Sequence, residues 1–493
     1  MAWICVDAGT SIIKAVGFDE DGHERALARE TSATLSTQPG FAEQDMNAVW
    51  STVLSAIRQV SRDLSGAVRG IAITAQGDGC WLVDAEGNPT GNAILWNDGR
   101  AGAVVDSWRE SGVIEQAFRL SGSVAYPGLP NAILRWLEQN EPERIEKARW
   151  SLTCNGWLFS KLTGVFLADL SDGSNPFSAV MLKSYSPDLF RLYGLEHSAH
   201  LMPPIHTGAG LIAPLARAVA EQSGLPPGTP VIMAPYDIVS TAIGCGTIVP
   251  RQACAILGTT ICAEVVTDAV DLSASPAGTT IALEGGNYLR AMPTLTGCEA
   301  LAWAAKALSC GSIEELECLA RSATAGSNGL LFLPYLSLAG ERSPFLEPNA
   351  RASFIGLSLG HTRADMARSV YEGLAFVIRE CLEAAVGGLP SELRVCGGGA
   401  RSDLWCQIIA DATDIPIVRT EDNEVGARGA FLFALAATGN AASIAEAVRS
   451  HVAPARTFSP SAGKHALYRE RFHLFLQQRA LAVPQWRLYG SRA

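Results

Sequence analysis

Short apolar runs bounded by turn residues alternate with longer segments of helical periodicity along most of the chain. Residues 3–7 and 12–19 are expected to form two strands around the tight turn Ala8-Gly9-Thr10-Ser11. Asp21-Gly22 is expected to turn the chain into a second hairpin. Further strands are predicted at residues 68–74, 81–84, 231–234, 253–257, 261–266 and 393–396.

Apolar residues at helical spacing predict helices over 48–64, 365–385 and 404–412. The second of these reads as amphipathic, with Met366, Val370, Leu374 and Ile378 inward and Thr362 as its cap. The tail from about Pro454 is expected to be a packed helix with a short loose end. Strands interleaved with helices indicate an α/β protein.

One octapeptide is repeated in outline in the second half of the chain. Residues 5–12 align with residues 254–261, and each copy reads as strand, Gly-Thr-Ser/Thr turn, strand. Asp7 in the first copy is matched by Ile256 in the second. If the fold is duplicated and both turns face one cleft, only the first turn brings a carboxylate to that cleft. The alternative is that the similarity of the two segments arose by chance, because Gly-Thr turns are common.

Length and composition narrow the class of protein. A chain of 493 residues is too long for one compact core, and Gly244-Cys245-Gly246 suggests a boundary between domains at 1–244 and 245–493. The net charge of −11 argues against non-specific binding to nucleic acid or to acidic membranes. The 12 cysteines show no CxxC spacing, no basic leader precedes the first strand, and no run of 18 apolar residues occurs. We therefore expect a reduced, cytoplasmic protein.

The first Gly-Thr turn offers groups that can bind phosphate. Gly9 permits a close approach, and the N–H groups and hydroxyls of Thr10 and Ser11 can bind phosphate oxygens. Asp7 could hold Mg²⁺ directly or through water, and Lys14 could add positive charge. A plain hairpin with an exposed lysine is the alternative. Walker A, GxGxxG and HExxH sequences are all missing from the chain.

Asp237 lies where a predicted strand gives way to a helix rich in small residues. A carboxylate at such a junction could accept the proton of an attacking hydroxyl. The same position favours aspartate as a simple helix N-cap, so both interpretations stand at this point.

Two polar segments follow predicted strands and suit a polyhydroxyl ligand. They are Gln76-Gly77-Asp78-Gly79 and Trp96-Asn97-Asp98-Gly99-Arg100. Sugars are bound by carboxylate and amide hydrogen bonds together with stacking on an aromatic ring. Asp-Gly turns need no ligand, however, and Trp96 could belong to the core. A third segment is Gly397-Gly398-Gly399-Ala400. Because glycine has no side chain, a nucleotide base or ribose could lie close to this backbone; the alternative is a simple tight turn.

Taken in order, these segments resemble the FGGY carbohydrate kinases, which include glycerol kinase, xylulokinase, ribulokinase and erythritol kinase. Residues 7–11 resemble the family's first phosphate loop and residues 257–260 its second, and Asp237 falls where the family has its catalytic base. The C-terminal signature is matched by Ala352–Leu357 followed by Asp365–Glu372, and residues 340–344 resemble a loop near the cleft.

The resemblance implies an α/β fold of two actin-like (ribonuclease H-like) domains flanking an active-site cleft. It implies ATP and Mg²⁺ as cofactors, Asp237 as the catalytic base and Asp7 as the metal ligand. The implied sugar-binding residues are Gln76, Gly77, Asp78, Trp96, Asp98 and Asp237. The implied ATP and phosphate contacts are Gly9, Thr10, Ser11, Lys14, Gly258, Thr259, Thr260, Gly398, Gly399, Ala400 and Asp403. A homodimer is the expected assembly from the prevalence of symmetric dimers.

The two sugar segments point to different substrates. Residues 93–100 are very like xylulokinase, whereas Asp78 stands where xylulokinases usually have histidine. Gln76-Gly77-Asp78-Gly79 is closer to erythritol kinases and to L-xylulose-type kinases, and Ile133 replaces a usual lysine in the N-terminal signature. We expect a ketopentose of the xylulose type, with erythritol or glycerol as the alternative acceptor. An actin-like ATPase and a sugar-binding module without transfer are the alternatives from other classes.

Overall fold

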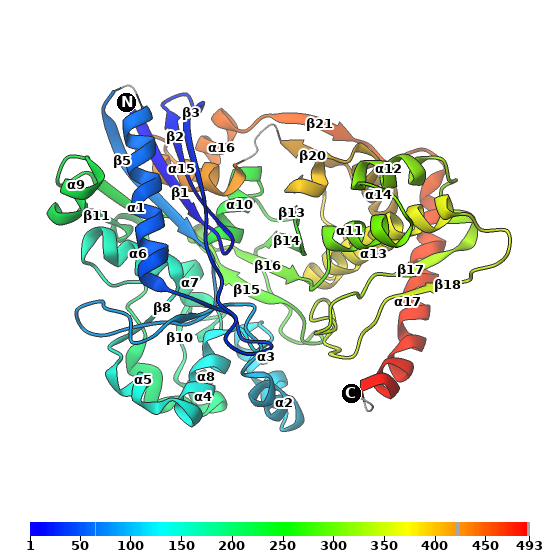
Figure 1. Cartoon of the computed structure of the whole chain (residues 1–493), viewed down its shortest axis with the longest axis horizontal. Helices are drawn as coiled ribbons and strands as arrows, with labels where there is room; N and C mark the ends of the chain where they lie inside the picture. The colour runs from blue at the N-terminus through cyan, green and yellow to red at the C-terminus, as the bar shows by residue number, and fades with distance from the viewer. Residues whose placement is uncertain (65, 421–423, 491–493) are drawn as a thin grey trace. The chain divides into compact units, whose positions relative to one another are not determined.

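The computed structural model describes residues 1–64, 66–420 and 424–490 (Figure 1). Its residues form two compact units, each assembled from three stretches of sequence. Unit 1 comprises Met1–Ile248, Asp268–Leu289 and Glu424–Val452, and unit 2 comprises Val249–Thr267, Arg290–Asn423 and Ala453–Ala493. The division into a sugar-binding domain of residues 1–244 and an ATP-binding domain of residues 245–493 stays a prediction.

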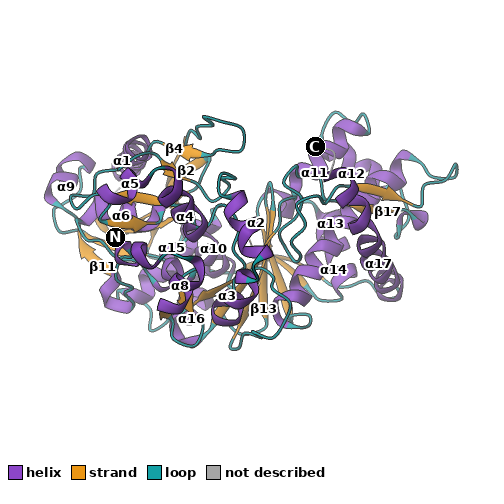
Figure 2. Cartoon of the chain, turned by 90° about the horizontal axis from the view of Figure 1, so that it is seen from below, coloured by secondary structure: helices purple, strands orange, loops and turns teal. Residues whose placement is uncertain are grey.

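Both units combine helices with β-sheets, as Figure 2 shows, so the predicted α/β class is confirmed. Among the residues described, no helix combines the length and apolar content that crossing a bilayer requires. None of the 12 cysteines forms a disulfide within the described ranges, and most are buried, as small apolar side chains usually are.

Unit 1 is built on a six-stranded sheet in the order β11-β12-β5-β1-β2-β3. β1 is antiparallel to β2 and parallel to β5, and β5 is parallel to β12. The strands are β1 (Ala2–Ala8), β2 (Ile12–Asp19), β3 (Glu24–Thr31), β5 (Val68–Ala75), β11 (Ile212–Pro214) and β12 (Pro230–Met233). Because parallel strands end at the same edge of a sheet, the segments that follow β1, β5 and β12 are brought together.

Helices cover this sheet on its two faces. In Figure 1, α1 (Met46–Asp63) lies in front of β1 to β3, and α15 (Val425–Ala437) lies behind β1. α10 (Asp237–Cys245) packs along α15. The bare backbones of two glycines permit this packing, because a Cβ on Gly244 would lie 2.0 Å from the Val425 carbonyl oxygen and one on Gly429 1.7 Å from the Ser240 carbonyl oxygen.

The remaining elements of unit 1 are short. Its other strands are β4 (Glu43–Gln44), β6 (Trp81–Val83), β7 (Ala93–Ile94), β8 (Trp150–Leu152), β9 (Ser178–Ala179), β10 (Ser184–Tyr185) and β15 (Thr279–Ala282). Its other helices are α2 (Gly102–Glu110), α3 (Val113–Ser121), α4 (Pro130–Asn140), α5 (Pro142–Lys147), α6 (Cys154–Thr163), α7 (Leu170–Ser174), α8 (Pro187–Tyr193), α9 (Arg217–Ser223), α16 (Ile444–His451), and the 3₁₀ turns η1 (Glu196–Leu201), η2 (Gly208–Leu211) and η3 (Glu284–Gly286).

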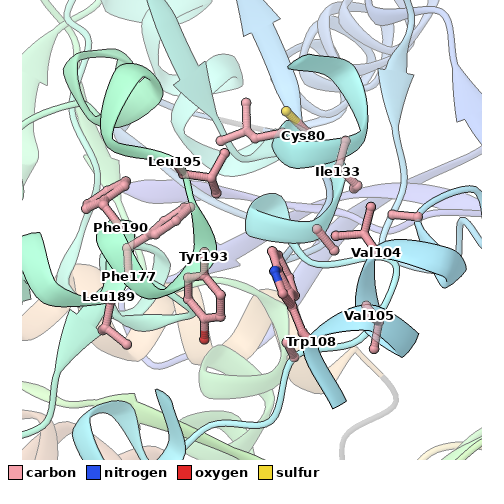
Figure 3. Packing of buried hydrophobic residues seen from close by; sticks show 14 of the residues in the cluster. Cys80, Val104, Val105, Trp108, Ile133, Phe177, Leu189, Phe190, Tyr193 and Leu195 are labelled. Atoms are coloured by element: carbon pink, nitrogen blue, oxygen red, sulfur yellow. The ribbon is translucent and has the colours of Figure 1, made fainter. Parts of the chain in front are cut away.

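A separate apolar cluster joins α2, α3, α4 and α8 in unit 1 (Figure 3). Phe177 stacks on Phe190 with ring centroids 4.4 Å apart, and Trp108 lies 4.8 Å from Tyr193. Cys80 and Ile94, next to the two predicted sugar-binding segments, belong to the same cluster. The segments are therefore attached to a packed core.

Unit 2 contains a second sheet with strands in the order β16-β14-β13-β19-β20-β21. These are β13 (Gln252–Leu257), β14 (Ile261–Thr267), β16 (Tyr288–Pro293), β19 (Glu392–Cys396), β20 (Ile417–Thr420) and β21 (Pro454–Phe458); β17 (Leu331–Leu333) pairs with β18 (Ser353–Ile355). Its helices are α11 (Cys298–Ala307), α12 (Ile313–Arg321), α13 (Arg363–Val386), α14 (Asp403–Thr413), α17 (Lys464–Gly490), η4 (Ser327–Gly329) and η5 (Gly398–Arg401).

Two expectations for unit 2 change in the structure. Thr362 and Asp365 form the capping box of α13, as the sequence suggests, but most of this helix is buried all round, so one-sided burial was wrong. α12, α14 and β17 all pack against it, which explains why both faces are covered. The tail does not begin with the helix: Pro454–Phe458 forms β21, an edge strand antiparallel to β20, before α17 starts.

Candidate active site

Asp7 ends β1, and Lys14 faces it across the hairpin. The Nζ of Lys14 lies 3.6 Å from Oδ2 of Asp7 and 3.1 Å from Oε2 of Glu424. Burial raises the pKa of Asp7, an effect that Lys14 opposes and Glu424 reinforces. Burial alone would lower the pKa of Lys14, but the two carboxylates raise it above its ordinary value.

Glu424 belongs to the same group of charged side chains as Asp7 and Lys14, which the sequence did not reveal. Its carboxylate, 4% exposed, binds Lys14 from β2 and Arg29 from β3. It directly precedes α15, and a Cβ on the neighbouring Gly426 would lie 2.8 Å from Oδ2 of Asp7. The first turn of α15 therefore lies against Asp7, and only glycine leaves room for it. An acidic residue followed by glycines at a helix start was the available signal.

The hydroxyl of Thr10 connects the first Gly-Thr turn to both sugar segments. It donates to Oε1 of Gln76 at 2.8 Å and accepts from the indole Nε1 of Trp96 at 2.9 Å. Gln44 accepts from Gln76 at 2.8 Å and donates to the Thr10 carbonyl at 2.8 Å. Gln76 is buried. The structure thus brings the three segments together, and it engages the Thr10 side chain with Gln76 and Trp96.

Asp237 is the first residue of α10, preceded by Tyr236 at the cap position. Its Oδ1 accepts the N–H of Ile238 at 2.8 Å. Burial, and then the charges of Asp7 and Asp78, raise the pKa of Asp237 to about 8, although N–H groups of Ile238 and Gly77 oppose the shift. A carboxyl that titrates near neutrality suits proton transfer.

Four buried side chains from separate elements fix the turn before Asp237. Thr74 and Ser240 each donate a hydroxyl hydrogen bond of 2.6 Å to the Pro235 carbonyl. The other two contacts are the Asn155 amide donating to the Ala234 carbonyl at 2.9 Å and the Ser171 hydroxyl accepting the Tyr236 N–H at 3.1 Å. Sequence reasoning missed these residues, because each is an ordinary polar residue whose sequence context gives no sign of the contact.

Asp78 occupies a left-handed backbone conformation, with φ 54°. The Tyr126 hydroxyl donates to its Oδ2, and the Asn175 amide donates to its Oδ1 at 3.2 Å. Aspartate tolerates this conformation better than most residues. Next to it, a Cβ on Gly77 would lie 2.1 Å from a ring carbon of Tyr236, so the loop and the Asp237 turn are in direct contact. Tyr126 was also missed by the sequence reasoning.

Asp98 behaves differently from the other predicted sugar-binding residues. It is buried and accepts hydrogen bonds from the Ala42 N–H at 2.6 Å and from Nε of Arg100 at 2.9 Å. Arg100 also binds Glu43 at 2.6 Å and lies 4.1 Å from the Phe41 ring centroid. These contacts hold the Trp96 segment in place. A direct contact of Asp98 with substrate stays a prediction.

The remaining predicted ATP contacts lie in unit 2. Gly258, Thr259 and Thr260 form the turn between β13 and β14, where the Gly258 N–H bonds the Thr260 carbonyl at 3.2 Å. Gly398, Gly399 and Ala400 lie in η5, directly after β19. Asp403 begins α14 and pairs with Arg419 at 3.0 Å and with Arg456. Their binding of nucleotide stays a prediction.

The carboxylate of Asp7 supplies the kind of oxygen ligand that Mg²⁺ prefers. Repulsion by the charge of Asp7 contributes to the raised pKa of Asp237. A divalent cation with oxygen ligands would relieve that repulsion, and Mg²⁺ in phosphoryl-transfer sites is held by one or two carboxylates together with phosphate oxygens.

Comparison with known proteins assigns both halves of the chain to one family. The model described as the FGGY family of carbohydrate kinases, N-terminal domain, matches residues 2–244, and the model of the C-terminal domain matches residues 253–438. The chain is 31% identical over 506 residues to erythritol kinase of Brucella abortus (strain 2308), covering 98% of this chain and 96% of that protein. It is 32% identical over 485 residues to L-xylulose/3-keto-L-gulonate kinase of Escherichia coli (strain K12), covering 96% and 95%. A ligand-bound xylulose kinase from Lactobacillus acidophilus has the same fold, with a TM-score of 0.94 over 99% of both chains at 23% identity.

Proposed function

Because the chain belongs to the FGGY family of carbohydrate kinases, we propose that it transfers the γ-phosphoryl group of ATP to a hydroxyl of a ketopentose of the xylulose type. One observation carries the proposal: Asp237 lies against the Gln76–Gly79 loop, where Gly77 contacts Tyr236 and the charge of Asp78 acts on Asp237. A basic group beside a loop of polar side chains is what transfer to a sugar hydroxyl requires.

In the proposed reaction, Asp237 orients the acceptor hydroxyl and accepts its proton. The proton moves late, because the transition state of phosphoryl transfer is loose and the attacking oxygen gains little bonding early. Gln76, Asp78 and Trp96 position the sugar. The buried bonds of the preceding turn keep Asp237 in one place, which favours the reactive geometry.

Asp7 would hold Mg²⁺, which when bound neutralises charge on the β- and γ-phosphate oxygens. Gly9, Thr10, Ser11 and Lys14 would contribute phosphate contacts through backbone N–H groups and the ammonium group. In unit 2, the proposed ATP contacts are the turn at Gly258, Thr259 and Thr260 and the segment containing Gly398, Gly399, Ala400 and Asp403.

A four-carbon polyol is the second candidate acceptor. It is favoured by the 31% identity to an erythritol kinase and by Asp78, which stands where xylulokinases usually carry histidine. The two candidate acceptors differ in their hydroxyl groups. An enzyme discriminates between such substrates when the wrong one leaves a buried polar group of the pocket without a hydrogen-bond partner.

The test is an ADP-release assay over pentuloses, hexuloses, tetritols and glycerol, with the product identified by mass. We expect one ketopentose, L-xylulose before D-xylulose, to give the highest kcat/KM, and erythritol to lead if the second candidate holds. ATP hydrolysis that does not depend on any sugar would instead favour an actin-like ATPase. Sugar binding without a phosphorylated product would favour a module that does not transfer.

The proposal includes a cytoplasmic homodimer as the working form. ATP and sugar substrates of this kind are available in the cytoplasm, and symmetric dimers are the commonest assemblies of soluble enzymes. Light scattering coupled to gel filtration should give twice the mass of the 52.1 kDa chain, and a single-chain mass would refute the dimer.

A further inference from the structure

Two side chains that hold the turn before Asp237 are themselves bonded to carboxylates of α7. The first is Ser171, whose oxygen accepts the Tyr236 N–H at 3.1 Å. Its hydroxyl hydrogen is donated to Oδ2 of Asp169 at 2.6 Å, and Asp169 is only 3% exposed. Because this hydrogen is taken up by Asp169, the oxygen of Ser171 is left to present a lone pair to the Tyr236 N–H. Asp169 therefore sets the direction of that hydrogen bond.

The second side chain is Asn155, which is completely buried. Its amide nitrogen donates to the Ala234 carbonyl at 2.9 Å and to Oδ2 of Asp172 at 3.3 Å. If the amide were rotated by half a turn, its oxygen would face these two acceptors and lose both bonds. Asp172 thus favours the orientation in which Asn155 holds the backbone at Ala234.

Resting on the proposed kinase function, we propose that Asp169 and Asp172 are positioning residues that fix Asp237 for proton transfer. Each acts through one polar side chain, and the two chains of hydrogen bonds reach the backbone groups on either side of Pro235. Neither carboxyl group has to touch a substrate. A base displaced by about 1 Å can lose about 100-fold in rate, so these bonds bear directly on turnover.

The first experiment changes Ser171. Ser171→Ala should lower kcat about tenfold or more and leave KM for ATP and for the sugar within about twofold, because the variant loosens the base without removing a group that binds either substrate. Ser171→Thr keeps the hydroxyl, and Ser171 lines a cavity of about 120 Å³ that has room for the added methyl group. The threonine variant should therefore retain at least about half of the wild-type kcat.

Ser174→Ala is the matched control, because it removes a buried hydroxyl from the same helix. Ser174 accepts the Ala282 N–H at 2.8 Å and has its bond to β15 instead of to the Asp237 turn. Its kcat should stay within about twofold of wild type.

The second experiment compares two changes at Asp172. Burial, and then repulsion from Asp169, raise the pKa of Asp172 well above its ordinary value, so this carboxyl holds a proton more readily than an exposed aspartate. Asparagine resembles the protonated form and still offers an oxygen to Asn155, so Asp172→Asn should keep kcat within about threefold. Asp172→Ala offers no acceptor and should lower kcat about tenfold or more with KM nearly unchanged.

A double-mutant cycle tests whether Asp169 acts through Ser171. Asp169→Ala should lower kcat at least as much as Ser171→Ala, and the two changes combined should be no worse than Asp169→Ala alone by more than about twofold. Effects that multiply would overturn the relay. If Asp169→Ala fails to fold, as scanning calorimetry would show, the variants of Ser171 and Asp172 still decide the proposal.

Three further results would overturn the inference. They are a normal kcat in Ser171→Ala or Asp172→Ala, an equal loss in Ser171→Thr and Ser171→Ala, and an equal loss in Ser174→Ala, which would point to a general role of α7 in folding. If the wild-type enzyme phosphorylates no compound of the substrate panel, the kinase proposal itself fails, which is a different result.

Discussion

Replacing Asp237 by asparagine should make the protein more stable at alkaline pH while removing its activity. The side chain of Asp237 is partly buried, and its ionised form is repelled by Asp7 and Asp78. Asparagine has the same shape and can still accept the N–H of Ile238, but it carries no charge. The variant thus removes an electrostatic cost from the folded state and removes the proposed base at the same time.

The size of the effect follows from the raised pKa. An aspartate in an unfolded chain titrates near 4, and burial with two neighbouring carboxylates raises the pKa of Asp237 to about 8. At about 1.36 kcal/mol per pH unit, ionising the folded protein costs at most about 5 kcal/mol more than ionising the unfolded chain. Asp237 is partly exposed, and water screens the repulsion, so we expect a gain of about 1–3 kcal/mol.

The sign of the pH dependence is fixed by linkage. The folded protein binds the Asp237 proton more tightly than the unfolded chain does, so the contribution of this group is favourable at low pH. It is lost progressively as the pH rises from about 4 to about 8 and is constant above that. The stability difference between Asp237→Asn and wild type should therefore be small at pH 5 and largest at pH 8.5.

Scanning calorimetry without nucleotide, sugar or divalent metal, at pH 5 and at pH 8.5, measures this difference. Asp188→Asn is the matched control, because it removes an exposed carboxylate and should change stability by less than about 0.5 kcal/mol. Phosphoryl transfer by Asp237→Asn should fall by about 10²–10⁴-fold. A stability difference that is the same at both pH values, or a variant with normal turnover, would refute the reasoning.

Three further outcomes follow from the same geometry. The kcat/KM for the sugar should rise about tenfold per pH unit below the pKa of Asp237, which is about 8 without metal and lower when Mg²⁺ offsets the charge of Asp7, because the ionised form is the base; a profile that stays flat down to about pH 5 would remove Asp237 from this role. Gly77→Ala should lower kcat/KM at least about tenfold, since its Cβ would lie 2.1 Å from the Tyr236 ring, whereas Gly102→Ala, with nothing within 4 Å, should be neutral in the same assay. Glu424→Gln should cost about 1–2 kcal/mol in urea denaturation, because it leaves two cations without their shared carboxylate; an unchanged midpoint would contradict this.

Local pattern was enough to predict much of the framework. The strands around the first Gly-Thr turn appear as β1 and β2, and the helix starting near Thr362 appears as α13 with its capping box. The position of Asp237 between a strand and a helix was also correct. These features depend on the alternation of apolar residues and on turn and cap chemistry, which act over a few residues.

Long-range packing explains what the sequence reasoning missed. α13 is buried on nearly all sides because elements from distant stretches of the chain cover both of its faces, which its own periodicity does not encode. Pro454–Phe458 becomes a strand because β20 offers an unpaired edge. Asp98 resembles a sugar ligand by position, but its oxygens bond Ala42 and Arg100.

The sequence by itself determined the α/β class, the order of the chemically important segments and the identity of Asp7, Asp78 and Asp237 as candidates. Only the tertiary structure showed that the Gln76–Gly79 loop contacts the turn before Asp237, that Tyr126 fixes Asp78, and that Glu424 joins the first turn from about 400 residues away along the chain. The reason is physical: a hydrogen bond or a charge–charge interaction depends on distance in space. That distance is set when parallel strands, far apart along the chain, end at one edge of a sheet.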